Sequence, residues 1–262
     1  MKNPKSVAVL LSSVLFFCGC FSPRVQAPTL HQRPVGFWEN EGSVVQVLHT
    51  YQIATMDFTE NLEIKKVQML STGIVVNVNG MVFTNHHAVT ATNLAENTFY
   101  VPDSDKIEVC KVLAGIPDCL EANLVNTDIG HDFALLTVKQ LFDRPVTFID
   151  DHSLKLGAEV YLWGNIQDWA PPSPMVGRFV NWIAEPYVKQ ENFGAILLPL
   201  LIVDISFQEG SSGGPTFDSL GRCVGQNRFF TTAGGRSLAA STPSSDMMKF
   251  LDDNNVSYKV EK

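Results

Sequence analysis

Three separate segments of the chain carry residue types that together could activate a hydroxyl nucleophile. Ser212 lies in the glycine-rich run Gly-Ser-Ser-Gly-Gly, and His87 and Asp132 stand earlier in the chain. A serine hydroxyl becomes a good nucleophile when an imidazole takes its proton, and a buried carboxylate must then fix the tautomer of that imidazole. The combination indicates acyl-transfer chemistry, with a covalent intermediate on the serine.

The glycines around Ser212 suit the same chemistry. Glycine lets the backbone adopt conformations closed to other residues and lets a substrate approach closely. It also leaves backbone N–H groups that can converge on one point, as an oxyanion hole requires. Taken alone, such a run is more typical of a flexible loop or a phosphate-binding turn. Its interpretation therefore depends on the histidine and aspartate segments.

Those segments match a known family. The order His, Asp, Ser along the chain is that of the chymotrypsin architecture, not of subtilisins or α/β-hydrolases. The chain resembles the trypsin-like serine peptidases, most closely the HtrA/Deg branch, and the resemblance runs from about residue 42 to residue 251. The segments that carry it are STGIVV at 71–76, TNHHAV at 84–89, DFALL at 132–136 and GSSGGP at 210–215, with weaker similarity at 154–165, 203–205 and 242–244.

The resemblance implies a role for each residue of the three segments. His87 would be the general base, because the motif's histidine directly precedes the Ala-Val pair, and Asp132 would orient it. Ser212 would be the nucleophile, and the backbone N–H groups of Gly210 and Ser212 would form the oxyanion hole.

Two rivals remain open: His86 as the base and Asp128 as the carboxylate. The resemblance also places Ser206 at the base of the primary specificity pocket. A neutral serine there favours small or apolar substrate side chains over lysine or arginine. Ser211 stands where the family usually has Asn or Asp, which leaves both N–H donors in place.

The rest of the chain predicts an all-β protein. Short apolar or alternating runs recur between Gly and Pro turn signals, and Asn79-Gly80 is a strong two-residue hairpin signal. The run 195–203, interrupted by Pro199, predicts a pair of buried strands. One short helix is expected near the end, with Thr242 as N-cap and Pro243 as its first residue. The other expected strands cover 43–48, 70–78, 81–84, 107–113, 133–138, 159–163, 177–182 and 223–229.

With the family resemblance, this pattern implies two six-stranded antiparallel β-barrels of the chymotrypsin type followed by a short C-terminal helix. We expect the first barrel over 42–145, with the histidine and the aspartate. The second is expected over 146–242, with the serine, and the helix and tail over 243–262. The length of 262 residues and the 45% hydrophobic content exclude collagenous, disordered and coiled-coil classes.

The N-terminus predicts export. Lys2 and Lys5 precede a short apolar run, as in a secretory signal that is too short to remain as a membrane span. The signal is expected over residues 1–19, and its end resembles the lipobox of bacterial lipoproteins, which would make Cys20 the lipidated first residue of the mature chain. An ordinary cleaved signal is the alternative. Residues 20–41 predict a tether, and the protein is expected in the bacterial envelope or secreted.

Cysteine usage fits an oxidising compartment without requiring one. Cys110 and Cys119 flank a turn with Gly and Pro, so they could form a disulfide or remain two half-buried thiols. Cys223 is expected in a core strand. No cysteine spacing after the signal fits a metal site, and we expect neither a metal nor an organic cofactor.

The sequence therefore predicts an exported serine endopeptidase whose partners are protein or peptide substrates. The alternative is a catalytically silent protein of the same fold that binds peptides or partners, with loop 166–176 placed to cover the site. The formal charge of −8 and the scattered lysines and arginines argue against nucleic acid. No PDZ module is expected, and the oligomeric state is left open.

Overall fold

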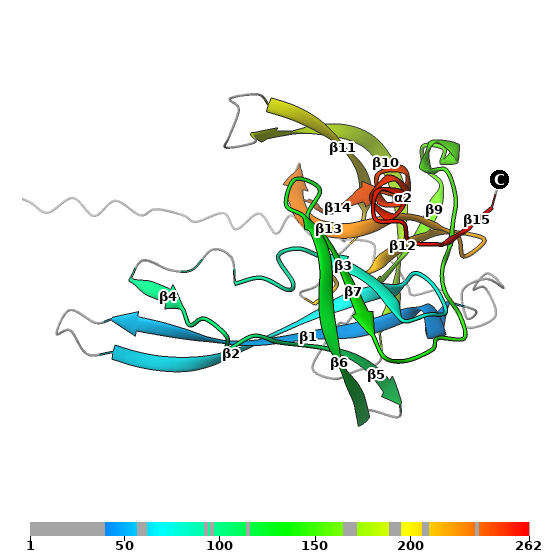
Figure 1. Cartoon of the computed structure of the whole chain (residues 1–262). Helices are drawn as coiled ribbons and strands as arrows, with labels where there is room; N and C mark the ends of the chain where they lie inside the picture. Colours follow the sequence, from blue (N-terminus) through cyan, green and yellow to red (C-terminus); the bar gives the residue numbers. More distant parts are fainter. Residues whose placement is uncertain are drawn as a thin grey trace, which may run out of the picture. The chain divides into compact units, whose positions relative to one another are not determined.

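The computed structural model describes residues 40–56, 62–91, 94, 97–113, 116–164, 172–188, 195–205, 210–233 and 236–261 (Figure 1). Strands dominate, and among these residues no helix is both long and apolar enough to cross a bilayer. The strands are β1 Val44–Met56, β2 Leu62–Val75, β3 Met81–Asn85, β4 Thr98–Tyr100, β5 Lys106–Leu113, β6 Ile116–Asp128, β7 Phe133–Val138, β8 Thr147–Phe148, β9 Glu159–Gly164, β10 Ser173–Val188, β11 Ala195–Asp204, β12 Pro215–Asp218, β13 Cys223–Ala233, β14 Arg236–Pro243 and β15 Lys259–Val260. The helical segments are η2 Glu41–Ser43, η3 Asp151–Ser153 and α2 Ser244–Asp253.

The first sheet closes into a ring of six strands. Its order is β2-β3-β7-β6-β5-β1, and β1 pairs with β2 to complete the ring, while β4 adds to β1 outside it. The hairpin between β2 and β3 turns at Gly80, whose φ of +90° lies in the region that glycine enters without strain. Buried side chains from alternate strand positions, Val45, Val47, Val75 and Val82 among them, fill its interior.

The second sheet closes in the same way. Strands β9, β10, β11, β14, β13 and β12 pair in turn, and β12 pairs back onto β9. Two short strands, β8 and β15, extend this sheet beyond β13. The prediction of two six-stranded antiparallel barrels with a short C-terminal helix is confirmed.

The run predicted as two strands around Pro199 is one strand, β11. Pro199 pairs with Ala184 of β10, whereas β14 joins β11 only from Leu201 onward. The proline therefore stands where β11 has a single neighbour among the described strands, as is usual for proline in a sheet. That position explains why the strand continues through it.

The C-terminal helix begins one residue later than the sequence predicts. Thr242 and Pro243 are the last residues of β14, paired with Gln226 and Gly225 of β13. The helix starts at Ser244, where the Asp151 carboxylate accepts hydrogen bonds from the Ser245 N–H at 2.7 Å and the Ser244 hydroxyl at 3.1 Å. A carboxylate from another element thus caps the helix, in place of the expected threonine.

Cys110 and Cys119 stand opposite each other in β5 and β6 and form a disulfide. Replacing both by serine is expected to lower the free energy of unfolding by about 2.5 kcal/mol, because the bond closes a short loop in the unfolded chain. Calorimetry with and without reductant measures this: reductant should lower the Tm of the wild type and leave that of the double variant unchanged. Equal effects on both proteins would contradict the prediction.

Candidate active site

His87 and Asp132 are brought together by the pairing of two strands. His87 follows β3 and Asp132 immediately precedes β7, and these strands are antiparallel with Asn85 opposite Phe133. His87 Nδ1 lies 2.7 Å from Asp132 Oδ2, and the backbone N–H of His87 donates to Asp132 Oδ1 at 2.9 Å. The two carboxylate oxygens therefore hold both the ring and the backbone of one histidine.

The backbone of Asp132 is itself held in an unusual conformation. Its φ is +61°, in the left-handed region that aspartate and asparagine tolerate better than most residues. Its carbonyl oxygen accepts hydrogen bonds from the His86 N–H at 2.9 Å and from Asn85 Nδ2 at 3.1 Å. These bonds fix the turn from which the carboxylate reaches His87.

Hydrogen bonds from both barrels hold the loop that carries Ser212. The Thr72 N–H on β2 donates to the Ser212 carbonyl at 2.9 Å, and the Thr72 hydroxyl donates to the Gly210 carbonyl at 2.7 Å. From the second barrel, the Asn227 carbonyl accepts a hydrogen bond from the Gly213 N–H at 2.9 Å. At Gly213 φ is +84°, and a Cβ would lie 2.2 Å from the Thr72 carbonyl oxygen, so only glycine fits.

Two backbone donors in this loop have no acceptor within the described ranges. The N–H groups of Gly210 and Ser212 donate to none of the residues that the structure describes. The Ser212 side chain is half-buried, and within the described part of the chain its hydroxyl makes no hydrogen bond with His87. Bonds of that kind often close only when substrate binds. Unpaired N–H groups beside a serine are the donor arrangement that an oxyanion hole needs.

A buried polar chain links the aspartate to the serine loop. Asn85 Nδ2 also approaches Gln226 Oε1 at 3.3 Å, and Gln226 Nε2 donates to the Gly213 carbonyl at 3.4 Å. Asn85 and Gln226 are both fully buried. Because the two side chains come from different barrels, the bridge fixes one half of the site against the other. No pattern in the sequence predicts that these two side chains meet.

Arg228 on β13 approaches the same aspartate from the second barrel. Its Nε lies 3.9 Å from Asp132 Oδ2, and its Nη2 donates to the Gly130 carbonyl at 3.1 Å. Both side chains of the ion pair are largely buried, with exposed fractions of 13% and 12%. A positive charge therefore stands beside the carboxylate that holds His87, a feature that no motif in the sequence indicates.

The rival residues have other surroundings. His86 is half-buried, its Nδ1 has no partner among the described residues, and desolvation lowers the pKa of its ring. Asp128 Oδ2 lies 2.7 Å from His131 Nδ1 and so serves a different histidine. Ser206 and Cys20 lie outside the described residues.

The Asp128–His131 pair predicts a pH-dependent contribution to stability. The hydrogen bond between them raises the pKa of His131 and lowers the pKa of Asp128. The histidine contribution is therefore complete below its unfolded pKa of about 6.5 and is lost as pH rises through the folded value. The aspartate contribution is complete above about pH 3.9 and is lost on acidification through its lowered pKa.

Asp128→Asn is accordingly expected to destabilise the protein more at pH 5.5 than at pH 8.5. The difference should be only about 0.5 kcal/mol, because the side chains are 29% and 35% exposed and solvent screens them. Urea unfolding at the two pH values measures it. An equal loss at both would show that the ion pair contributes nothing.

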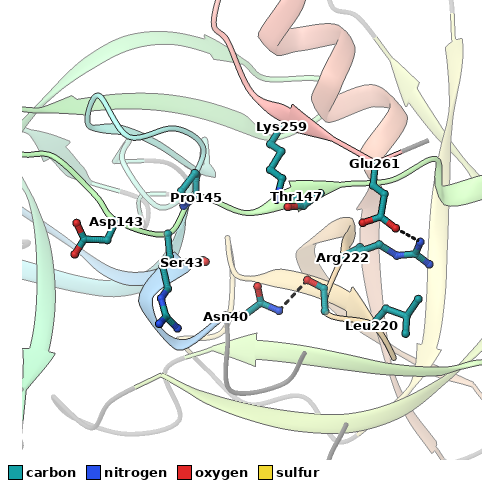
Figure 2. Close-up of a pocket in the computed structure, with 11 residues that line it drawn as sticks. Asn40, Ser43, Asp143, Pro145, Thr147, Leu220, Arg222, Lys259 and Glu261 are labelled. Atoms are coloured by element: carbon teal, nitrogen blue, oxygen red, sulfur yellow. Dashed lines mark hydrogen bonds and ion pairs between the residues drawn. The ribbon is translucent and has the colours of Figure 1, made fainter. Parts of the chain in front are cut away.

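A pocket of about 430 Å³ lies elsewhere, between the entry to β1, residues 143–147, the turn before β13 and β15 (Figure 2). Across it Asn40 Nδ2 donates to the Gly221 carbonyl at 2.8 Å, and Arg222 pairs with Glu261 at 2.9 Å. None of the candidate catalytic residues lines it. Asp150, Asp151 and His152 are grouped closely enough to hold a metal, but the Asp151 carboxylate already caps α2.

Comparisons with known proteins agree with the fold. The trypsin-like peptidase domain family matches residues 71–225. A probable periplasmic serine endoprotease DegP-like of Pseudomonas fulva is 29% identical over 203 residues, which are 76% of this chain and 37% of that protein. The serine protease Do-like HtrB of Bacillus subtilis is 22% identical over 69% of this chain and 37% of its own length. The match thus spans well under half of these relatives.

Solved structures give the same fold. The Rv3671c protease of M. tuberculosis in its active form has a TM-score of 0.62 at 20% identity, with 87% of each chain covered. Its inactive form has a TM-score of 0.58 at 20% identity, with 84% of this chain and 96% of that chain covered. With a family match over more than half of its length, this chain belongs to the trypsin-like peptidase domain family.

Proposed function

We propose that the chain is an exported serine endopeptidase that cleaves peptide bonds through an acyl-enzyme on Ser212. The observation that carries the proposal is the His87–Asp132 pair at 2.7 Å, next to a serine loop in which two N–H groups have no partner among the described residues. His87 takes the hydroxyl proton as Ser212 attacks the carbonyl carbon, and Asp132 holds the tautomer that leaves Nε2 free.

In the tetrahedral intermediate the former carbonyl oxygen carries a negative charge, and the Gly210 and Ser212 N–H groups can donate hydrogen bonds to it. Collapse of the intermediate breaks the C–N bond, and the imidazolium gives its proton to the leaving amine. Water then attacks the ester with His87 again as base, which releases the second product and regenerates the hydroxyl. No step needs a metal or an organic cofactor.

Export, the specificity pocket and the anchor belong to the same proposal. Names of relatives that include the word periplasmic support export, as does the disulfide between Cys110 and Cys119. We assign Ser206 to the specificity pocket, which would then admit small or apolar side chains, and Cys20 to lipidation. Mass spectrometry of the mature protein from a bacterial host tests the anchor, because a lipid at Cys20 adds a fixed mass.

Labelling with a fluorophosphonate probe tests the proposal directly. The probe should modify the wild type at Ser212 and leave Ser212→Ala unlabelled, and only the wild type should degrade unfolded casein. Ser211→Ala is the matched control, since it removes the neighbouring hydroxyl of the same loop. If the folded wild type neither reacts nor cleaves, the chain is a catalytically silent binder of the same fold.

A further inference from the structure

One edge of β2 has no neighbouring strand along most of its length in the part of the chain that the structure describes. β2 pairs with β1 from Leu62 to Ile74, but it pairs with β3 only at Ile74 and Val75. No described strand pairs with the other side of β2 between Leu62 and Gly73. In Figure 1 the outer parts of β1 and β2 run side by side away from the barrel. A long open edge is a template for the addition of another strand.

The residues that face this edge can be identified from two hydrogen bonds. The Thr72 N–H donates to the Ser212 carbonyl, so Thr72 faces away from β1. On β1, the Gln52 carbonyl accepts from the Val101 N–H, so Gln52 faces away from β2, and its partner Lys66 faces away from β1. The register has no shift between these points. Because the direction alternates, Ile64, Lys66 and Gln68 also present their N–H and C=O groups to the edge.

The edge leads directly to the candidate active site. Its first outward-facing residue, Thr72, donates its N–H to the backbone carbonyl of Ser212. The stretch from there to Ile64 is about 26 Å long at about 3.3 Å per residue. A polypeptide bound at Ser212 can therefore continue along it without leaving the protein surface. Such a segment would need about ten residues beyond the scissile bond.

The acyl-transfer mechanism indicates which half of the substrate would lie along the edge of β2. The acyl half stays bonded to Ser212 in the second barrel, whereas the leaving amine takes its proton from His87 in the first barrel, to which β2 belongs. The C-terminal half of a substrate that runs outward from the site would also be antiparallel to β2, which is the more stable pairing. Both considerations favour the C-terminal half.

One face of the outer hairpin is apolar. The register places Ala54, Met56, Leu62, Ile64 and Phe99 on the same face of β1, β2 and β4. Four of these residues are exposed, with exposed fractions of 45% for Met56, 60% for Leu62, 57% for Ile64 and 55% for Phe99. Apolar side chains at alternate positions of an added strand would cover this face. Unfolded polypeptides present such side chains, and folded proteins bury them.

We propose that the open edge of β2 from Gln68 to Ile64 binds the C-terminal flank of an unfolded polypeptide substrate as an added antiparallel strand. The inference rests on the proposed endopeptidase function. It adds a backbone docking site that extends well beyond the residues next to the cleaved bond.

Proline at an outward-facing position tests the proposal with little disturbance of the fold. Gln68→Pro removes an edge donor and blocks strand addition sterically, while the N–H groups that pair with β1 stay in place. Two peptides with the same cleavage sequence are compared, one ending two residues after the scissile bond and one ending twelve residues after it. The wild type should cleave the long peptide with at least tenfold higher kcat/KM.

Gln68→Pro should lower kcat/KM for the long peptide to the value for the short peptide. It should leave kcat/KM for the short peptide unchanged. Gln68→Ala, which loses the same side chain but keeps the N–H, should retain the preference. A peptide extended by the same length on its N-terminal side should show no increase in kcat/KM from pairing with the edge of β2. Equal cleavage of long and short peptides by the wild type, or a preference that survives in Gln68→Pro, would overturn the inference.

Hydrogen exchange separates this inference from the catalytic proposal. In the Ser212→Ala variant, the long peptide should slow exchange of the outward-facing amides of Ile64, Lys66 and Gln68. The amides of Lys65 and Val67, which pair with β1, should already exchange slowly without peptide. Protection of the edge without any cleavage by the wild type would leave docking in place and refute the peptidase. Cleavage without protection would refute docking alone.

Discussion

Replacing His87 by alanine is expected to lower kcat/KM on peptide substrates by about 10⁴- to 10⁶-fold. In the proposed mechanism the imidazole is the group that takes the proton of Ser212, so without it only the Gly210 and Ser212 N–H groups remain to assist attack. Steady-state assays on a peptide cleaved by the wild type measure the loss, and circular dichroism verifies the fold.

His86→Ala is the matched control, because the two histidines are adjacent and both are half-buried. It should cost at most about tenfold, since the bond of His86 to Asp132 comes from its backbone N–H and survives the substitution. The fluorophosphonate probe should label His86→Ala at nearly the wild-type rate and His87→Ala far more slowly. The reverse order of the two losses would transfer the base role to His86.

The candidate residues of the site could be proposed from the sequence because each lies in a short segment with its own signal. His87 and Asp132 adjoin the apolar strands β3 and β7, and the pairing of those strands alone brings the two together. The glycines around Ser212 are required locally, as the φ of +84° at Gly213 shows. Such signals depend on a few neighbouring residues and can therefore be recognised in a single sequence.

The contacts between the barrels could not be predicted in this way. Asn85 and Gln226 meet only because the two barrels pack against each other, and neither residue type signals such a contact in the sequence. Arg228 would be read from sequence as a surface residue of β13, because arginine is rarely buried without a partner. Its partner Asp132 is 96 positions away in the sequence and comes from the other barrel.

The outer parts of β1 and β2 cannot be predicted from the sequence for a related reason. The sequence predicts a first strand over 43–48 and a second over 70–78, whereas β1 continues to Met56 and β2 begins at Leu62. In the outer half of β2 nearly every side chain is exposed, and the alternation of polar and apolar types changes phase at Lys66, so the pattern does not extend over a whole strand. Pairing with β1 determines this stretch, and the open edge of β2 arises there.

Asp132→Asn is expected to lower kcat by about 10⁴-fold near neutral pH while leaving the fold intact. Asparagine has the same shape and tolerates the φ of +61° at this position, so the backbone bonds to His86 and Asn85 can persist. Its amide nitrogen, however, would donate to His87 Nδ1. That bond places the ring proton on Nε2, which can then no longer accept the proton of Ser212.

Asp128→Asn is the matched control for this variant. It makes the same chemical change four residues earlier, on a carboxylate that pairs with His131 and not with His87. Its effect on kcat should be less than about twofold, and its loss of stability should be larger at pH 5.5 than at pH 8.5. If Asp128→Asn lost activity and Asp132→Asn kept it, the two aspartates would have to exchange roles. Similar small effects from both would mean that His87 acts without a carboxylate, and the 2.7 Å contact would then have no catalytic part.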